Sequence, residues 1–173
     1  ADETEMGPLC TNAQVDHIDA QVTRAVEQGA TILTGGARVD GMDGLYYQPT
    51  IIDCPSQDLD IVDTELFGPV LSVQRFTSED EVIGLANDTK HGLAAGIFTR
   101  DSARSLRMTK AIRAGIVWVN TYRVISPIAA FGGVKSSGYG REAGMQAMEN
   151  YTRAKTVWMN TSDEPISSPF VMR

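Results

Sequence analysis

The fold is decided by residues 70–119, which read VLSVQRFTSEDEVIGLANDTKHGLAAGIFTRDSARSLRMTKAIRAGIVWV. Three apolar runs stand out, at Val70 to Phe76, Leu93 to Thr99 and Ile116 to Val119. Each run has the length of a strand, and a segment of helical character separates it from the next. Two successive β-α-β units predict an α/β fold with a parallel sheet and right-handed crossovers.

The two helical segments of this stretch have recognisable starts. Ser78 and Glu81 open the first with the spacing of a capping box, and Asp101 can cap the second. We expect the second helix to reach about Arg113, because Gly115 then interrupts the pattern.

An amphipathic helix is predicted upstream, over about Asn12 to Gln28. Thr11 and Gln14 have capping-box spacing at its start, and Gly29 ends it. The apolar face comprises Val15, Ile18, Val22 and Val26. Short strands are expected at Thr31 to Thr34 and at Tyr46 to Asp53, on either side of a polar, glycine-rich loop.

Residues 121–141 interrupt the periodic pattern with Pro127 and several glycines. The segment is too long for a routine connection, so we expect a functional loop. A short helix with Met145 and Met148 on one side should follow. Arg153 to Met159 alternates as a strand does, and the chain after Asn160 is Ser- and Pro-rich, as loosely held tails are.

Composition excludes several classes of partner. The net charge is −7, with Lys and Arg scattered singly, so nucleic acid and anionic membranes are not expected partners. No apolar stretch has the length that spans a bilayer, and the first residues are acidic where a signal peptide is basic. These features favour one cytoplasmic domain with a packed core.

No active site is evident from residue types alone. Cys10 and Cys54 are isolated, which predicts neither a disulfide framework nor a zinc site. His17 and His91 have no nucleophile at a suggestive spacing. Gly132 to Gly138 resembles a phosphate loop only superficially, because its lysine precedes the last glycine.

The stretch Asp63-Thr-Glu65-Leu-Phe67-Gly-Pro69 is more informative. An ionised Glu65 accepts hydrogen bonds and can hold the two hydroxyls of a ribose, while a Phe67 ring can back a planar ring. The alternative is a solvated glutamate beside a core phenylalanine.

Four motifs follow one another in order: Glu65-Leu-Phe-Gly-Pro-Val; Ala86-Asn with Gly92-Leu-Ala-Ala; Val117-Trp-Val-Asn; and Phe131-Gly-Gly-Val-Lys-Ser-Ser-Gly-Tyr-Gly-Arg-Glu142. Together they resemble the aldehyde dehydrogenase superfamily, and the match runs from Gly7-Pro8 to about Val157. The resemblance implies an α/β fold with a cofactor domain, a catalytic domain and a small oligomerisation element.

The resemblance also implies a reaction with an aldehyde and NAD or NADP. A cysteine thiolate attacks the aldehyde, the thiohemiacetal passes hydride to nicotinamide, and water activated by a glutamate hydrolyses the thioester. In the family the nucleophile, that glutamate and the dinucleotide site all precede the position of Gly7, so we expect them outside this chain. Neither Cys10 nor Cys54 matches the nucleophile.

The resemblance implies individual roles for those residues of this chain that match the family motifs. By resemblance, Glu65 would bond the nicotinamide ribose, and Phe67 and Leu93 would pack beside the nicotinamide. Phe131 matches an aromatic wall where cofactor and substrate tunnel meet, and Ile125 matches a tunnel position often occupied by an aromatic residue.

Glu142 matches a family carboxylate near the inner end of the water path and is a candidate proton relay. The alternative is a salt bridge or helix-start residue beside Arg141. Two departures from the family pattern are Ala129-Ala130 in place of a common Ser-Pro pair, and Arg153 where some relatives carry an acid able to pair with the residue matching Arg141.

The family fold suggests boundaries. Residues 1–150 would be the C-terminal part of the catalytic domain, 151–160 a strand that joins a neighbouring subunit's sheet, and 161–173 a tail. The full-length protein would be a homodimer or homotetramer. Two alternatives stay open: a naturally truncated, non-catalytic binding or oligomerisation module, and a cofactor-independent enzyme that uses Cys10.

Overall fold

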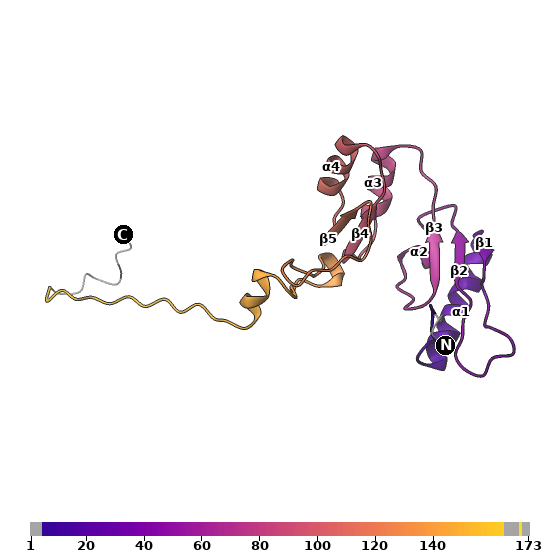
Figure 1. Cartoon of the computed structure of the whole chain (residues 1–173), viewed down its shortest axis with the longest axis horizontal. Helices are drawn as coiled ribbons and strands as arrows, with labels where there is room; N and C mark the ends of the chain where they lie inside the picture. The colour runs from indigo at the N-terminus through magenta and orange to yellow at the C-terminus, as the bar shows by residue number, and fades with distance from the viewer. Residues whose placement is uncertain (1–4, 165–169, 171–173) are drawn as a thin grey trace.

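The computed structural model describes residues 5–164 and 170, which form two lobes followed by a long extended segment (Figure 1). The first lobe contains α1 (Asn12–Glu27), β1 (Thr31–Thr34), β2 (Thr50–Asp53), α2 (Asp60–Asp63) and β3 (Val70–Val73). The second contains α3 (Glu79–Asn87), β4 (Ala94–Ile97), α4 (Ser102–Ala111) and β5 (Ile116–Val119). Two 3-10 helices follow, Lys135–Ser137 and Met145–Asn150. None of the helices in the described part of the chain is long and apolar enough to cross a membrane.

The first lobe is a three-stranded sheet in the order β1-β2-β3, with α1 packed near it. β1 runs antiparallel to β2, and β2 runs parallel to β3. Its core lies between α1, α2 and the sheet and consists of Val15, Ile18, Val22, Ala25, Ala30, Tyr47, Ile52, Cys54, Leu59, Ile61 and Leu66. This lobe therefore holds most of the buried apolar side chains of the described chain.

Helix α1 forms as predicted, with one shift in its buried face. The Thr11 hydroxyl accepts a hydrogen bond from the Gln14 amide at 3.2 Å, as an N-cap does. Val26, predicted to be buried, is 45% exposed, and Ala25 is fully buried instead. A spacing of three and four residues continues the stripe to Ala25 before the helix ends at Glu27.

Strand β2 is shorter than the predicted strand from Tyr46 to Asp53. Tyr47 makes only an isolated antiparallel bridge to Arg38, and regular pairing starts at Thr50. Pro49 lies between the two and has no N–H to donate, which explains the interruption of the ladder.

The second lobe confirms one β-α-β unit and corrects the other. β4 and β5 pair in parallel through α4, with Ala94 opposite Ile116. β3 and β4, however, belong to different sheets. The first predicted unit was therefore wrong, because an apolar run predicts that a strand exists but not which strand it will pair with.

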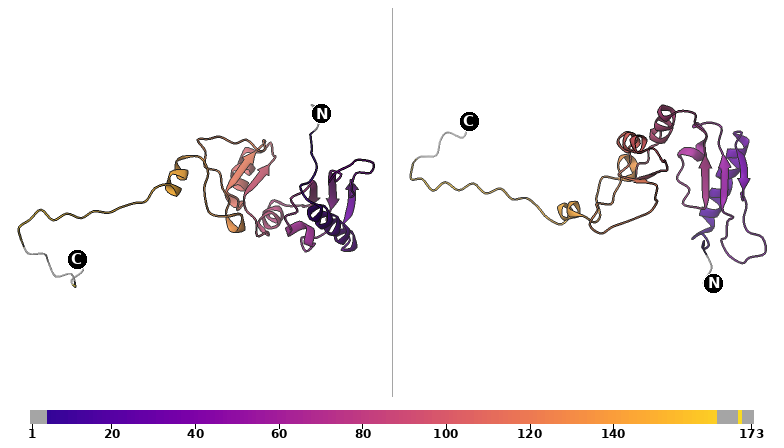
Figure 2. Two further views of the ribbon diagram at one scale, coloured as in Figure 1. Left: turned by 90° about the horizontal axis from the view of Figure 1, so that it is seen from below. Right: turned by 45° about the horizontal axis from the view of Figure 1, so that its top comes forward.

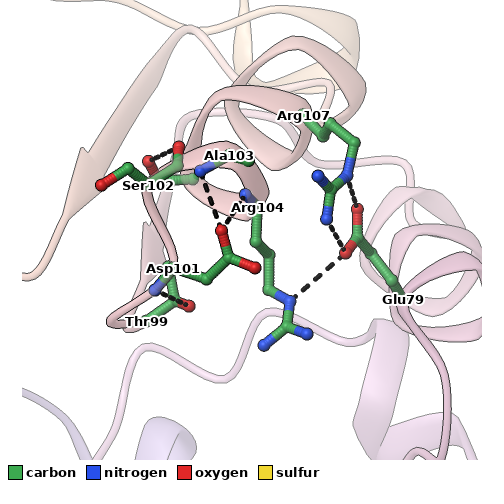
Figure 3. A network of polar contacts seen from close by, with 8 residues as sticks. Glu79, Thr99, Asp101, Ser102, Ala103, Arg104 and Arg107 are labelled. Atoms are coloured by element: carbon green, nitrogen blue, oxygen red, sulfur yellow. Dashed lines mark hydrogen bonds and ion pairs between the residues drawn. The ribbon is translucent and has the colours of Figure 1, made fainter.

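Acidic and basic side chains join the two helices of the second lobe (Figure 3). The Glu79 carboxylate on α3 pairs with Arg107 at 2.7 Å and with Arg104 at 3.3 Å, both on α4. Asp101 caps α4 by accepting from the amides of Ala103 and Arg104. The hydrogen bond from Arg107 is the largest of the effects that lower the pKa of Glu79, from its usual 4.5 to about 2.

This pairing predicts an acid-sensitive contribution to stability. Because the folded-state pKa of Glu79 is depressed, its contribution is fully present above about pH 4.5 and is lost as the pH falls toward 2. We expect the urea midpoint of Glu79→Gln to fall less than that of the wild-type chain between pH 5 and pH 3. Asp80→Asn, an exposed neighbour on the same turn, is the control. Equal falls in wild type and Glu79→Gln would contradict the assignment.

The C-terminal segment runs away from both lobes as an extended chain (Figure 2). The strand expected at Arg153 to Met159 is not formed, because no strand of the described chain lies beside it to supply hydrogen bonds. Val157, Trp158 and Met159 are exposed, as are Met145 and Met148 in the preceding 3-10 helix.

Candidate functional site

The loop from Glu65 to Gly68 presents its side chains in a fixed order. Leu66 inserts into the core of the first lobe, so the side chains on either side of it, Glu65 and Phe67, face outward. The Phe67 carbonyl accepts a hydrogen bond from the Gln14 side chain on α1. Phe67 also has a positive φ of 50°, which is unusual for a bulky residue and depends on these surrounding contacts.

Gly68 permits this loop to approach α1 closely. A Cβ atom at Gly68 would lie 2.2 Å from the terminal methyl group of Ile18. Ile18 is fully buried, so its side chain has little room to move away. Packing against Ile18 therefore requires the glycine of the Glu65-Leu-Phe-Gly-Pro motif. Its lack of a side chain lets the loop that carries Glu65 lie close to α1.

Glu65 and Leu93, which are far apart in sequence, line one cavity of about 590 Å³ between the lobes. Glu65 is exposed and has no hydrogen bond or ion pair within the described residues, so its carboxylate oxygens are available to a ligand. Leu93, 43% exposed, supplies an apolar surface of the same cavity. Phe67 is 74% exposed and does not line it.

The turn that carries Leu93 is held from two sides. The Asn87 side chain donates to the Ala111 carbonyl at 2.9 Å and accepts from the Arg113 amide at 2.7 Å. Lys135 donates from its ammonium group to the carbonyls of Asn87 and Thr89. The Asn87 motif and the glycine-rich motif thus meet in space.

The glycine-rich loop folds back on itself beside this turn. Phe131 and Glu142 exchange two backbone hydrogen bonds, of 2.6 and 2.7 Å. Gly132 approaches Gly115 so closely that a Cβ atom on Gly115 would lie 1.8 Å from the Gly132 carbonyl oxygen. These contacts place Phe131, a predicted wall residue, opposite Glu142, the predicted relay.

Arg141 is engaged within the same loop. Its guanidinium Nη1 donates to the carbonyls of Gly133, Tyr139 and Gly140. Glu142 forms no ion pair with it among the described residues, and the next helix begins only at Met145. The alternative interpretation of Glu142, as a salt-bridge or helix-start residue, is therefore not what the structure has.

Ile125 lies on the loop after β5 and is exposed, outside the cavity that Glu65 lines. Trp118 anchors that loop by donating its indole N–H to the Val124 carbonyl at 2.9 Å. The structure thus brings Glu65 to Leu93 and Phe131 to Glu142, but places Phe67 and Ile125 outside the shared cavity.

Both cysteines are free thiols and lie apart from this cavity. Cys10 is exposed at the start of α1, and Cys54 is buried at the end of β2, where burial raises the pKa of its thiol. Neither cysteine lines the cavity. The residues that do are Val62, Asp63, Thr64, Glu65, Ala86, Thr89, His91, Gly92, Leu93, Ala94, Ala95, Ile112, Arg113, Ala114, Ser136 and Ser137.

Sequence reasoning did not assign Asp63, Thr89 and His91 to the site, although all of them line the cavity. Asp63 accepts a hydrogen bond from the Thr89 hydroxyl, which holds the pKa of Asp63 below its usual value of 3.8. His91 lines the same cavity, and its Nε2 is buried without a hydrogen-bond partner in the described residues. Only the position of Asp63, two residues before Glu65, could have drawn attention to it.

Comparison with known proteins identifies the family of this chain. The family model for the aldehyde dehydrogenase family matches residues 1–157, and the chain therefore belongs to the aldehyde dehydrogenase family. It is 56% identical over 172 residues to the (Z)-2-((N-methylformamido)methylene)-5-hydroxybutyrolactone dehydrogenase of Acinetobacter baylyi, covering 99% of this chain and 35% of that protein.

Two further relatives are matched over a similar share of their length. Betaine aldehyde dehydrogenase of Brucella anthropi is 42% identical, over 96% of this chain and 34% of its own length. The solved NAD+ complex of an aldehyde dehydrogenase from Bacillus cereus superposes with a TM-score of 0.89 at 40% identity, covering 94% of this chain and 33% of that one. The chain thus spans about a third of the length of the relatives it matches.

Proposed function

We propose that this chain acts as the C-terminal part of a longer aldehyde dehydrogenase, which oxidises an aldehyde to a carboxylic acid with NAD+ or NADP+. The observation that carries the proposal is the cavity shared by Glu65 and Leu93, which lie on two different motifs of the resemblance and were both expected at the cofactor. Family membership and the shared coverage of about a third support it.

The residues of the cavity fit the nicotinamide end of such a nucleotide. Glu65 offers an unpaired, acceptor-only carboxylate to the two hydroxyls of a ribose. Leu93 offers an apolar surface to a planar ring, and Phe67 lies two residues after Glu65 on the same loop. When bound, the nucleotide supplies the hydride acceptor. The chain's own residues orient it, and the nucleophile belongs to the part of the protein outside this chain.

The remaining assignments concern the substrate side. Phe131 forms an aromatic wall where cofactor and aldehyde meet, and Ile125 lines the aldehyde tunnel. Glu142, held opposite Phe131 by backbone hydrogen bonds, relays a proton from the water path. Ile125 is smaller than an aromatic residue, so the tunnel should accept a wider aldehyde.

The function is tested by measuring aldehyde-dependent NADH or NADPH formation for two proteins. One is the 173-residue chain, and the other is a version extended at its N-terminus to the length of the relatives. Activity in the extended protein alone is the expected result. Activity in the short chain would contradict our placement of the nucleophile, and a Cys10→Ala variant of it would show whether Cys10 is responsible.

We further propose the domain boundaries and the assembly. Residues 1–150 belong to the catalytic domain, 151–160 form a strand that joins the sheet of a neighbouring subunit, and 161–173 form a tail, most of which lies outside the described residues. The backbone at 153–159 is extended and pairs with no strand of the described residues, and its apolar side chains are exposed; both features support this addition of a strand to a neighbouring sheet. The assembly is a homodimer or homotetramer, and the two free thiols favour a cytoplasmic location.

Self-association gives a direct prediction. We expect the 173-residue chain to form dimers or larger species at micromolar concentration, because pairing with a partner edge removes Trp158 and its apolar neighbours from water. Trp158→Ser should shift light scattering toward the monomer, whereas Met42→Ser, on an exposed loop of the first lobe, should not. A strictly monomeric wild-type chain would contradict the proposed strand.

A further inference from the structure

The two lobes are joined by a small group of polar contacts. Their sheets share no strand. Within residues 5–151, the hydrogen bonds and ion pairs that connect the lobes all end on the turn at 88–90. Gln57 donates to the Asp88 carbonyl at 2.7 Å. One Asp63 oxygen accepts from the Thr89 hydroxyl at 3.0 Å and from the Lys90 amide at 3.3 Å, and the other lies 3.7 Å from the Lys90 ammonium nitrogen.

These contacts lie beside the two residues assigned to the cofactor. Asp63 ends α2 and stands two residues before Glu65, on the first lobe. Thr89 stands four residues before Leu93, on the second lobe. Asp63 and Thr89 both line the cavity themselves. The contacts of Asp63 with Thr89 and Lys90 therefore link the segment that carries Glu65 to the segment that carries Leu93.

We propose that Asp63 and Thr89 are positioning residues, forming an interlobe clasp that holds Glu65 at its working distance from Leu93. The inference rests on the proposed function, because it concerns how the nicotinamide end of the nucleotide is aligned. Neither residue need touch the reacting atoms. Both act through Glu65 and Leu93, and hydride transfer is sensitive to small errors in such alignment.

The first measurement tests the clasp itself, in the 173-residue chain and without any activity. Asp63→Ala should speed hydrogen exchange of the Lys90 amide, which loses its acceptor. Thr89→Val should also speed exchange of the Lys90 amide, because Asp63 loses the hydrogen bond from the Thr89 hydroxyl. Thr89→Ser keeps a hydroxyl, so exchange of the Lys90 amide should be slower than in Thr89→Val. Asp43→Asn is the matched control, since Asp43 is exposed and makes no hydrogen bond or ion pair in the described chain.

The second measurement tests the positioning role in the extended protein. We expect Asp63→Ala and Thr89→Val each to lower kcat about tenfold with little change in aldehyde KM, since alignment rather than aldehyde binding is lost. Thr89→Ser should retain most of the activity because it keeps the hydroxyl. The double variant should be no slower than either single variant, as residues of one unit are not additive.

The outcomes separate the inference from the function on which it rests. Unchanged exchange at Lys90 in Asp63→Ala would overturn the clasp, whatever the activity. Faster exchange with unchanged kcat would overturn the positioning role. If the extended wild-type protein has no aldehyde-dependent activity, the proposed function fails and the positioning role fails with it, while the exchange data still decide whether the clasp exists.

Discussion

Replacing Glu65 by alanine in the extended protein is expected to lower kcat by about 10- to 100-fold while changing nucleotide affinity by less than about threefold. The reason is that Glu65 holds only the nicotinamide end of the nucleotide, whose misplacement slows hydride transfer. Most of the binding energy comes from parts of the nucleotide that this chain does not contact. Steady-state kinetics and nucleotide titration measure the two quantities separately.

Glu65→Gln sharpens this test, because the amide keeps the size of the side chain but replaces one acceptor oxygen by a donor. We expect it to be intermediate between alanine and wild type. Glu27→Ala, an exposed acid on α1 without a hydrogen bond or ion pair in the described chain, is the control for loss of charge. An unchanged kcat in Glu65→Ala would contradict the assignment of Glu65 to the ribose.

Ile52→Ala is expected to destabilise the first lobe by about 2–5 kcal/mol, the range for truncating a fully buried isoleucine. Ile52 lies on the central strand β2 and is completely buried in the core of that lobe. The effect combines the loss of apolar burial with the cavity left behind. Urea unfolding of the 173-residue chain, followed by far-UV circular dichroism, measures it.

Leu71→Ala is the matched control, since Leu71 lies on the neighbouring strand β3 opposite Ile51 and is exposed. We expect a change of less than about 0.5 kcal/mol for it, as for surface substitutions in general. Equal effects of the two substitutions would show that the sheet faces are buried differently from the arrangement described above.

Local features of the fold were predictable from the sequence. Ser78 and Asp101 cap α3 and α4 as expected, because an N-cap depends on a side chain and the amides two or three residues later. Strand pairing was not predictable in the same way. β3 pairs with β2 rather than β4, since the partner of a strand is decided by contacts distant in sequence.

The candidate site shows the same difference between what is visible in the sequence and what depends on contacts distant in sequence. Glu65 and Leu93 were identified by resemblance and then found in one cavity, although spacing alone favoured a solvated glutamate. Asp63 and Thr89 were missed because their hydrogen bond joins residues that lie in different lobes, and neither residue type signals such a contact. The strand at Arg153 to Met159 was predicted from its alternation, which describes side chains and does not supply a pairing partner.

The placement of the two tryptophans makes the chain its own optical reporter of assembly. Trp118 is half-buried in the second lobe, where it packs edge-on against Tyr122 with ring centroids 5.2 Å apart. Trp158, 93% exposed, stands on the extended segment. Dilution that separates subunits should therefore shift fluorescence emission to longer wavelength through Trp158 alone, while the Trp118 signal stays constant and serves as the internal reference.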